Sequence, residues 1–145
     1  MSTLLPRLYH RIVAPQAVID EMMAGIPVPT GDDILEHAPW LERVGAPVQG
    51  DTLSMVLGRG EAEAIALARQ YPESLLLIDD RQARRAASAL GLRATGSSGV
   101  LVRAKAETLI EAVKPLLLAM RQNGYYLSDR VIQRSCHMAG ESEAV

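Results

Sequence analysis

The chain has 145 residues, is 48% hydrophobic, and carries 15 basic and 17 acidic residues for a formal net charge of −2. This size and apolar content suit one globular domain, residues 1–145, with a buried core. The near-neutral balance argues against a coat protein that binds nucleic acid through excess positive charge alone. The apolar runs are too short to cross a bilayer and the first residues lack a signal-peptide pattern, so we expect a cytoplasmic protein without a membrane partner.

Strand and helix patterns alternate from the start of the chain. A β-branched run at residues 11–13 predicts a strand, and a helix is expected to follow it as far as residue 24, with Gly25 as its stop. Residues 25–50 contain four prolines and are expected to form a loop around a short piece at residues 41–44.

The remainder of the chain continues the alternation and then becomes helical. In chain order we expect a helix at 61–70, a strand at 75–78, a helix at 81–90, a strand at 92–95, and helices at 100–106, 109–123 and 128–140. Gly91, Gly124 and Gly140 stand where three of these helices should end, because glycine accepts the left-handed conformation that closes a helix. Strands and helices in alternation, followed by a helical tail, predict an α/β fold around a parallel sheet.

Two adjacent aspartates follow the most apolar of the predicted strands. Residues 75–78 form a continuous apolar run, as expected for a strand buried on both faces of a parallel sheet, and Asp79 and Asp80 come directly after it. Open parallel sheets bind ligands beyond the carboxyl ends of their strands, so both aspartates are candidate site residues. The competing interpretation is that one of them caps the following helix, and both interpretations hold if each aspartate has one role.

Three glutamates on the predicted helices are further candidates. Glu61 lies in the first turn of its helix, within Gly58-Arg59-Gly60-Glu61, where the helix dipole favours negative charge and glycine permits close backbone approach. Glu63 is two positions further along and points to a different face, so it is a secondary candidate. Glu21 lies at the edge of the apolar stripe of the first helix. Each of the three also has an ordinary interpretation as a structural or solvated helix residue.

Carboxylates gathered at one edge of a sheet would bind hard divalent cations, because magnesium and manganese prefer oxygen ligands. A bound cation polarises a phosphoryl oxygen and activates a water, which suits hydrolysis of phosphodiesters. The three histidines lack the spacing of zinc ligands, no serine lies in a nucleophile-elbow pattern, and Cys136 is the only cysteine. We therefore expect Mg²⁺ or Mn²⁺ as the cofactor.

A cluster of arginines follows the paired aspartates. Arg81, Arg84 and Arg85 lie in the helix predicted at residues 81–90, and Arg81 and Arg85 share one of its faces. These side chains are candidates for binding an RNA backbone. The alternative is a solvated helix face that pairs with glutamates.

Five segments, taken together, resemble a prokaryotic family of PIN-domain-like proteins that are predicted nucleases. They are residues 13–21, 60–68, 76–81, 91–101 and 124–128. The resemblance covers essentially the whole chain; no single segment is decisive, but their order is specific. It implies a three-layer α/β/α fold around a parallel sheet, and a metal-dependent ribonuclease related to the VapC toxins of toxin–antitoxin pairs. An RNA substrate and a small antitoxin partner are implied with it.

Four acidic positions converge on the metal in that family, and the resemblance places three of them in this chain. Glu21 matches the glutamate of the helix after the second strand, and Glu61 matches the acidic residue that opens the middle helix. Asp79 or Asp80 matches the aspartate after the next strand, and the register between these two is left open.

The fourth position, an aspartate at the end of a first strand, has no counterpart, and residues 4–9 resemble the close of the first helix. The resemblance therefore implies that the first strand and most of the first helix are missing, so that the catalytic set is incomplete. In the family that strand lies between the strands expected at 11–13 and 75–78. We expect these two strands to close together or another segment to fill the position, with strand exchange in a symmetric homodimer as the favoured form.

Two other functions are open from the sequence. One is a non-catalytic protein that keeps the PIN fold and binds RNA or an antitoxin. The other is a receiver-type phosphoacceptor domain, which also has paired acidic residues at strand ends, although the chain has no lysine at an equivalent late strand end.

Overall fold

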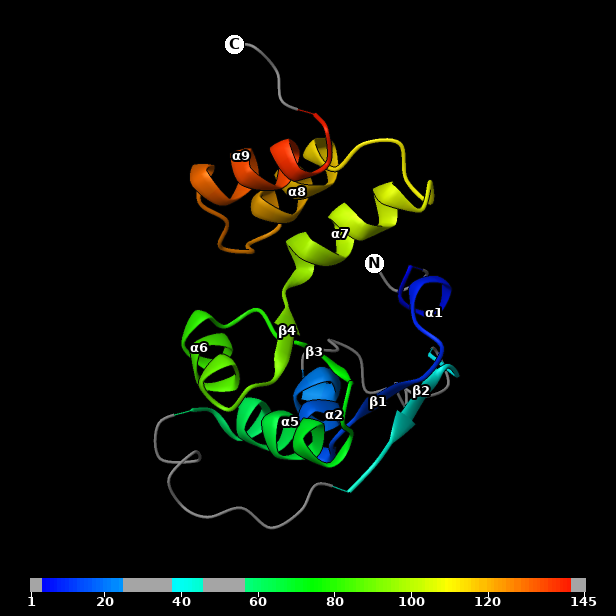
Figure 1. Cartoon of the computed structure of the whole chain (residues 1–145), viewed down its shortest axis with the longest axis vertical. Helices are drawn as coiled ribbons and strands as arrows, with labels where there is room; N and C mark the ends of the chain where they lie inside the picture. The colour runs from blue at the N-terminus through cyan, green and yellow to red at the C-terminus, as the bar shows by residue number, and fades with distance from the viewer. Residues whose placement is uncertain (1–3, 25–37, 46–56, 142–145) are drawn as a thin grey trace. The chain divides into compact units, whose positions relative to one another are not determined.

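The structure is a computed structural model that describes residues 4–24, 38–45 and 57–141 (Figure 1). The helix stop predicted at Gly25 and most of the loop predicted over residues 25–50 lie outside the described residues. The chain divides into two compact units, Met1–Ala94 and Thr95–Val145. None of the helices in the described ranges has the length and apolar character needed to span a bilayer.

The first unit alternates short strands with helices, which confirms the predicted α/β class. Its elements in chain order are α1 (Leu5–Leu8), β1 (Ile12–Ala14), α2 (Gln16–Ala24), β2 (Leu41–Arg43), α5 (Arg59–Gln70), β3 (Leu75–Leu77), α6 (Arg81–Ala89) and β4 (Arg93–Thr95), which ends at the boundary of the unit. The strands and helices predicted for this part are present, with bounds shifted by one or two residues.

β1 and β2 form a parallel two-stranded sheet, in which Ile12 stands opposite Leu41. A small core joins this sheet to α2, and its buried members are Ala14, Ile19, Ala38 and Leu41. Just before β1, Arg11 donates from Nε and Nη2 to the carboxylate of Glu42 at 2.8 and 3.3 Å, and its guanidinium lies 5.5 Å from the centre of the Tyr71 ring. The hydrogen bond from Arg11 holds the pKa of Glu42 below its ordinary value.

β3 and β4 form a second two-stranded sheet, and a larger core joins β3 to α5 and α6. The buried members of this core are Leu57, Ala62, Ile65, Ala68, Leu76, Ile78, Ala83 and Ala87. Because each pair of strands is held by its own core, β1 and β3 stay in separate sheets, and no strand among the described residues joins them. The expectation that these two strands close together is therefore wrong.

β1 and β3 instead line a common cavity of about 410 Å³. One wall comes from Val13 and its neighbours in β1, and another from Leu76 and its neighbours in β3. Apolar side chains of α5, among them Ala64 and Leu67, are a further part of the lining, which also includes Arg11 and Glu73. The position between the two strands is thus a mostly apolar space, and among the described residues each of these strands pairs with one other strand.

The described part of the second unit contains the helices α7 (Ser97–Ala106), α8 (Lys114–Gln122) and α9 (Asp129–Met138). α7 begins at Ser97 rather than at the predicted residue 100. α8 begins at Lys114 rather than at the predicted residue 109, because Pro115 in the first turn suits a helix start and cannot continue a helix from before it.

Three helices end at glycines with positive φ, as the sequence predicts. Gly91, Gly124 and Gly140 have φ angles of 77°, 101° and 76° and follow α6, α8 and α9. At the end of α9 the N–H of Gly140 donates to the carbonyl of His137, and the N–H of Glu141 donates to the carbonyl of Cys136. These two bonds form a Schellman motif, which a left-handed glycine allows.

The turn after α9 brings the side chain of Glu141 to the start of α8. Its carboxylate accepts the N–H of Val113 at 2.7 Å and the N–H of Lys114 at 3.2 Å, and it lies 2.9 Å from Nζ of Lys105 in α7. Burial by itself raises the pKa of Glu141, but these backbone N–H groups and the Lys105 ammonium together hold it below its ordinary value. One carboxylate therefore ties together the three helices of this unit.

Candidate functional site

The packing of α2 against α5 places Glu21 at the first turn of α5. A β-carbon added at Gly60 would lie 2.5 and 2.7 Å from the two carboxylate oxygens of Glu21. The carboxylate therefore occupies the space that the missing side chain of Gly60 leaves free. Glu21 is exposed, so this carboxylate is accessible from solvent.

Glu61 is the third residue of α5, and its carboxylate turns back toward the start of the helix. A β-carbon at Gly58, the N-cap residue, would lie 2.5 Å from Oε2 of Glu61. This is the position from which a glutamate reaches back in a capping box, and the positive end of the helix dipole favours its charge. Two carboxylates, those of Glu21 and Glu61, thus lie against two glycines at the N-terminal turn of α5.

The paired aspartates lie just beyond the carboxyl end of β3 and are both exposed. Asp80 is the N-cap of α6, and its Oδ2 accepts the N–H of Ala83 at 2.8 Å. The capping interpretation therefore holds for Asp80. Asp79 is not the cap of α6 and remains a candidate for a role in chemistry.

The arginines of α6 fall into two groups. Nη1 of Arg84 donates to the carbonyls of Ile78 and Asp79 at 3.3 and 2.6 Å, so this side chain ties α6 to the end of β3. Arg81 and Arg85 are exposed and make no hydrogen bond or ion pair with the part of the chain that the structure describes. The exposed pair is thus better suited than Arg84 to contact a ligand.

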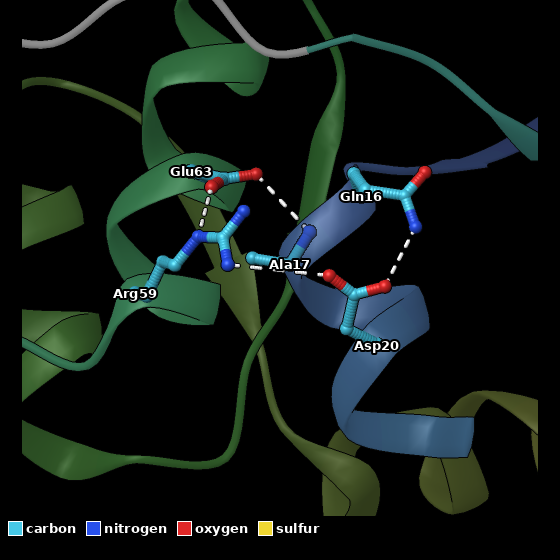
Figure 2. A network of polar contacts seen from close by, with 5 residues as sticks. All are labelled: Gln16, Ala17, Asp20, Arg59 and Glu63. Carbon is cyan, nitrogen blue, oxygen red and sulfur yellow. Dashed lines mark hydrogen bonds and ion pairs between the residues drawn. The ribbon is translucent and has the colours of Figure 1, made fainter. Parts of the chain in front are cut away.

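Glu63, the secondary candidate from the sequence, is the centre of a polar network between α2 and α5 (Figure 2). Its Oε1 accepts the N–H of Ala17 at 3.2 Å, and its Oε2 accepts Nε of Arg59 at 2.9 Å. Arg59 also lies 4.0 Å from the carboxylate of Asp20, to which Gln16 donates at 2.7 Å. The spacing of four residues between Arg59 and Glu63 was a signal for their ion pair, but no local pattern indicated the bond to Ala17.

The acidic residues match a metal site only in part. Within the described ranges, no group of three or more His, Cys, Asp or Glu residues is placed to hold a metal ion. Glu21 and Glu61 still match the usual way in which magnesium is bound, by one or two carboxylates, several waters and the phosphates of a substrate. Carboxylate oxygens are the donor type that a hard cation prefers, and the described residues do not form a metal site by themselves.

A protein-family model described as a PIN domain matches residues 2–141, a span that includes every candidate residue named above. No curated protein and no solved structure matches the chain significantly. The PIN domain is a nuclease-type fold, which agrees with acidic residues at a helix start and at the carboxyl end of a strand. Because the match extends over nearly all of the 145 residues, the chain belongs to the PIN-domain family.

Proposed function

We propose that this chain is a metal-dependent ribonuclease of the toxin type found in toxin–antitoxin pairs. The observation that carries the proposal is the pair of carboxylates, Glu21 and Glu61, that lie against Gly60 and Gly58 in a chain of the PIN-domain family. Asp79 is the proposed third acid. Asp80 follows it in the sequence and is the helix cap of α6.

Each part of the proposed site has a separate task. Bound Mg²⁺ or Mn²⁺ would polarise a phosphoryl oxygen of the RNA and lower the pKa of a coordinated water. Glu21 of α2 and Glu61 of α5 would hold the cation beside the first turn of α5 and leave part of its coordination shell to the RNA phosphate. The exposed guanidinium groups of Arg81 and Arg85 would contact neighbouring phosphates, which position a nucleic acid without reading its sequence.

The experiment that tests this function is an RNA cleavage assay. Structured and single-stranded RNAs are incubated with the protein and Mg²⁺ or Mn²⁺, with EDTA, with Glu61→Ala, and with Glu111→Ala as a control at an exposed glutamate. We expect cleavage that requires the cation and Glu61 and is unchanged in Glu111→Ala. Cleavage that survives either EDTA or the Glu61 substitution would exclude the metal-nuclease proposal.

A second candidate function is binding of RNA or a small antitoxin without turnover. It is favoured by the lack of a three-residue acidic group within the described ranges. Electrophoretic mobility shifts measured beside the cleavage assay distinguish the two functions. RNA bound in a manner that depends on Arg81 and Arg85, with no cleavage under any metal condition, would support the binding function instead.

We also propose a homodimer in which an extended segment of a second copy fills the cavity between β1 and β3. The support is that each of these strands pairs with one other strand among the described residues, and that the space they line is mostly apolar. The backbone of an extended segment can form hydrogen bonds with the unpaired edges of two strands at once. Apolar side chains alone cannot form these hydrogen bonds.

Substitution inside this cavity is expected to dissociate the dimer. Ala64→Lys would place a charged side chain against the incoming strand, whereas Ala89→Lys changes an exposed position of α6 and serves as the control. Light scattering over a concentration series should show a dimer for the unmodified chain and for Ala89→Lys, and a monomer for Ala64→Lys. A chain that stays monomeric at every concentration would contradict the dimer.

A further inference from the structure

The contacts between α2 and α5 follow a regular series. The N–H of Ala17 meets Glu63, and the carboxylate of Glu21 lies against Gly60. A step of four residues forward along α2 thus corresponds to a step of three residues backward along α5. Residues three or four positions apart lie on the same face of a helix, so these two contacts are neighbours in one interface. Within this interface α2 and α5 run antiparallel.

We infer that Glu63 is a positioning residue for Glu21, an inference that rests on the proposed function of Glu21. Ala17 is the second residue of α2, where the N–H has no acceptor within its own helix. The carboxylate of Glu63 supplies that acceptor from α5, and negative charge at a helix start is favourable. Because this bond fixes the start of α2 against α5, it also fixes Glu21 one turn later over Gly60.

The surroundings of Glu63 suit a positioning role and not that of a catalytic acid. Both of its carboxylate oxygens have partners, Ala17 and Arg59, and the Arg59 guanidinium balances its charge. Its side chain is 17% exposed, whereas Glu21 is exposed and Glu61 lies against the exposed Gly58. Of the two glutamates in the Glu61-Ala62-Glu63 sequence, Glu61 therefore has the proposed role in chemistry and Glu63 has a supporting role.

Variants of Glu63 test the inference in the full chain. Glu63→Ala removes both contacts, whereas Glu63→Gln keeps an oxygen that can accept the Ala17 N–H. The control is Glu107→Ala, which breaks an ion pair with Arg103 of the same spacing and residue order as that between Arg59 and Glu63, with N···O at 3.4 Å. Titration with Mn²⁺ alone should show an affinity about 10- to 100-fold lower for Glu63→Ala, the usual effect of losing a supporting residue. Glu63→Gln and Glu107→Ala should bind Mn²⁺ as the unmodified chain does.

A double-mutant cycle with Glu21→Ala shows whether Glu63 acts through Glu21. If it does, adding Glu63→Ala to Glu21→Ala lowers the Mn²⁺ affinity no further, because coupled residues are not additive. If the two substitutions instead lower the Mn²⁺ affinity independently, so that their fold-changes multiply, the inference is overturned.

A measurement without metal separates this inference from the proposed function. The amide resonance of Gly60 reports where the Glu21 carboxylate lies, and it should shift in Glu63→Ala and return in Glu63→Gln. If Glu21→Ala leaves Mn²⁺ affinity unchanged, the proposed function fails and the Gly60 resonance alone decides on positioning. A Gly60 resonance that does not move in Glu63→Ala overturns the positioning role in either case.

Discussion

Replacing Gly60 with alanine is expected to lower RNA cleavage by about 100-fold while the chain remains folded. The added β-carbon would lie 2.5 Å from Oε1 of Glu21, so this carboxylate, at the far end of a flexible side chain, must move. A displacement of about 1 Å in a catalytic group can cost on the order of 100-fold in rate. The helix itself tolerates the change, because alanine is favoured over glycine by about 1 kcal/mol in helices.

Two further glycines make this prediction specific. Gly58→Ala should lower cleavage in the same way, since its β-carbon would meet the carboxylate of Glu61. Gly45→Ala should leave cleavage unchanged, because nothing lies within 4 Å of its added β-carbon. The measurement is the initial rate of cleavage beside the free energy of unfolding in urea. Full activity in Gly60→Ala, with stability retained, would show that the position of Glu21 does not matter for the reaction.

Removal of the Glu141 side chain is expected to destabilise the helical unit. Glu141→Ala deletes the acceptor of the Val113 and Lys114 N–H groups and the partner of Lys105. Hydrogen bonds to a charged group and a helix cap together predict a loss of about 2–4 kcal/mol in the free energy of unfolding. Glu111→Ala, at an exposed position in the same unit, should change it by less than about 0.5 kcal/mol.

The contribution of Glu141 should also depend on pH. Its folded pKa lies below the ordinary value of about 4.3, so its stabilisation is complete above that value and is lost as the pH falls through the folded pKa. Glu141→Gln cannot titrate, so its free energy of unfolding should fall less than that of the unmodified chain between neutral pH and about pH 3. Parallel curves for the two proteins would mean that the carboxylate carries no special stabilisation.

The helical tail shows where sequence patterns suffice and where they fail. Gly124 and Gly140 indicated the ends of their helices, because glycine is favoured at the left-handed position that closes a helix. The end of α7 at Ala106 was predicted, but the conformation that closes this helix was not, because Thr108, with φ of 59°, and not a glycine takes the left-handed conformation there. The N–H of Thr108 donates to Lys105 and that of Leu109 to Ala104, the same pair of bonds as in the glycine-closed helices. A β-branched residue in this conformation gives no local signal.

In the candidate site, too, features that depend on residues close in sequence could be predicted, and features that depend on distant residues could not. Glu61 at a helix start and an aspartate capping a helix follow from residues close in sequence, and both were predictable. The bond that makes Glu63 a supporting residue joins it to Ala17, 46 positions away. The division of the strands between two sheets likewise depends on which apolar side chains share a core, a matter of packing that periodicity does not encode.

The two separate cores also affect how Glu21 and Glu61 become separated when part of the chain unfolds. Glu21 is carried by α2, whose Ile19 belongs to the small core of β1 and β2, whereas Glu61 is carried by α5, whose Ile65 belongs to the larger core. No strand pairing among the described residues links the two sheets, so α2 is joined to α5 by helix packing and by the polar contacts of Glu63 and Arg59, and a local opening of the smaller core must break these contacts. Such an opening withdraws one carboxylate and leaves the other in place. We therefore expect the proximity of the two carboxylates to depend on the local stability of the smaller core as well as on the global stability of the chain.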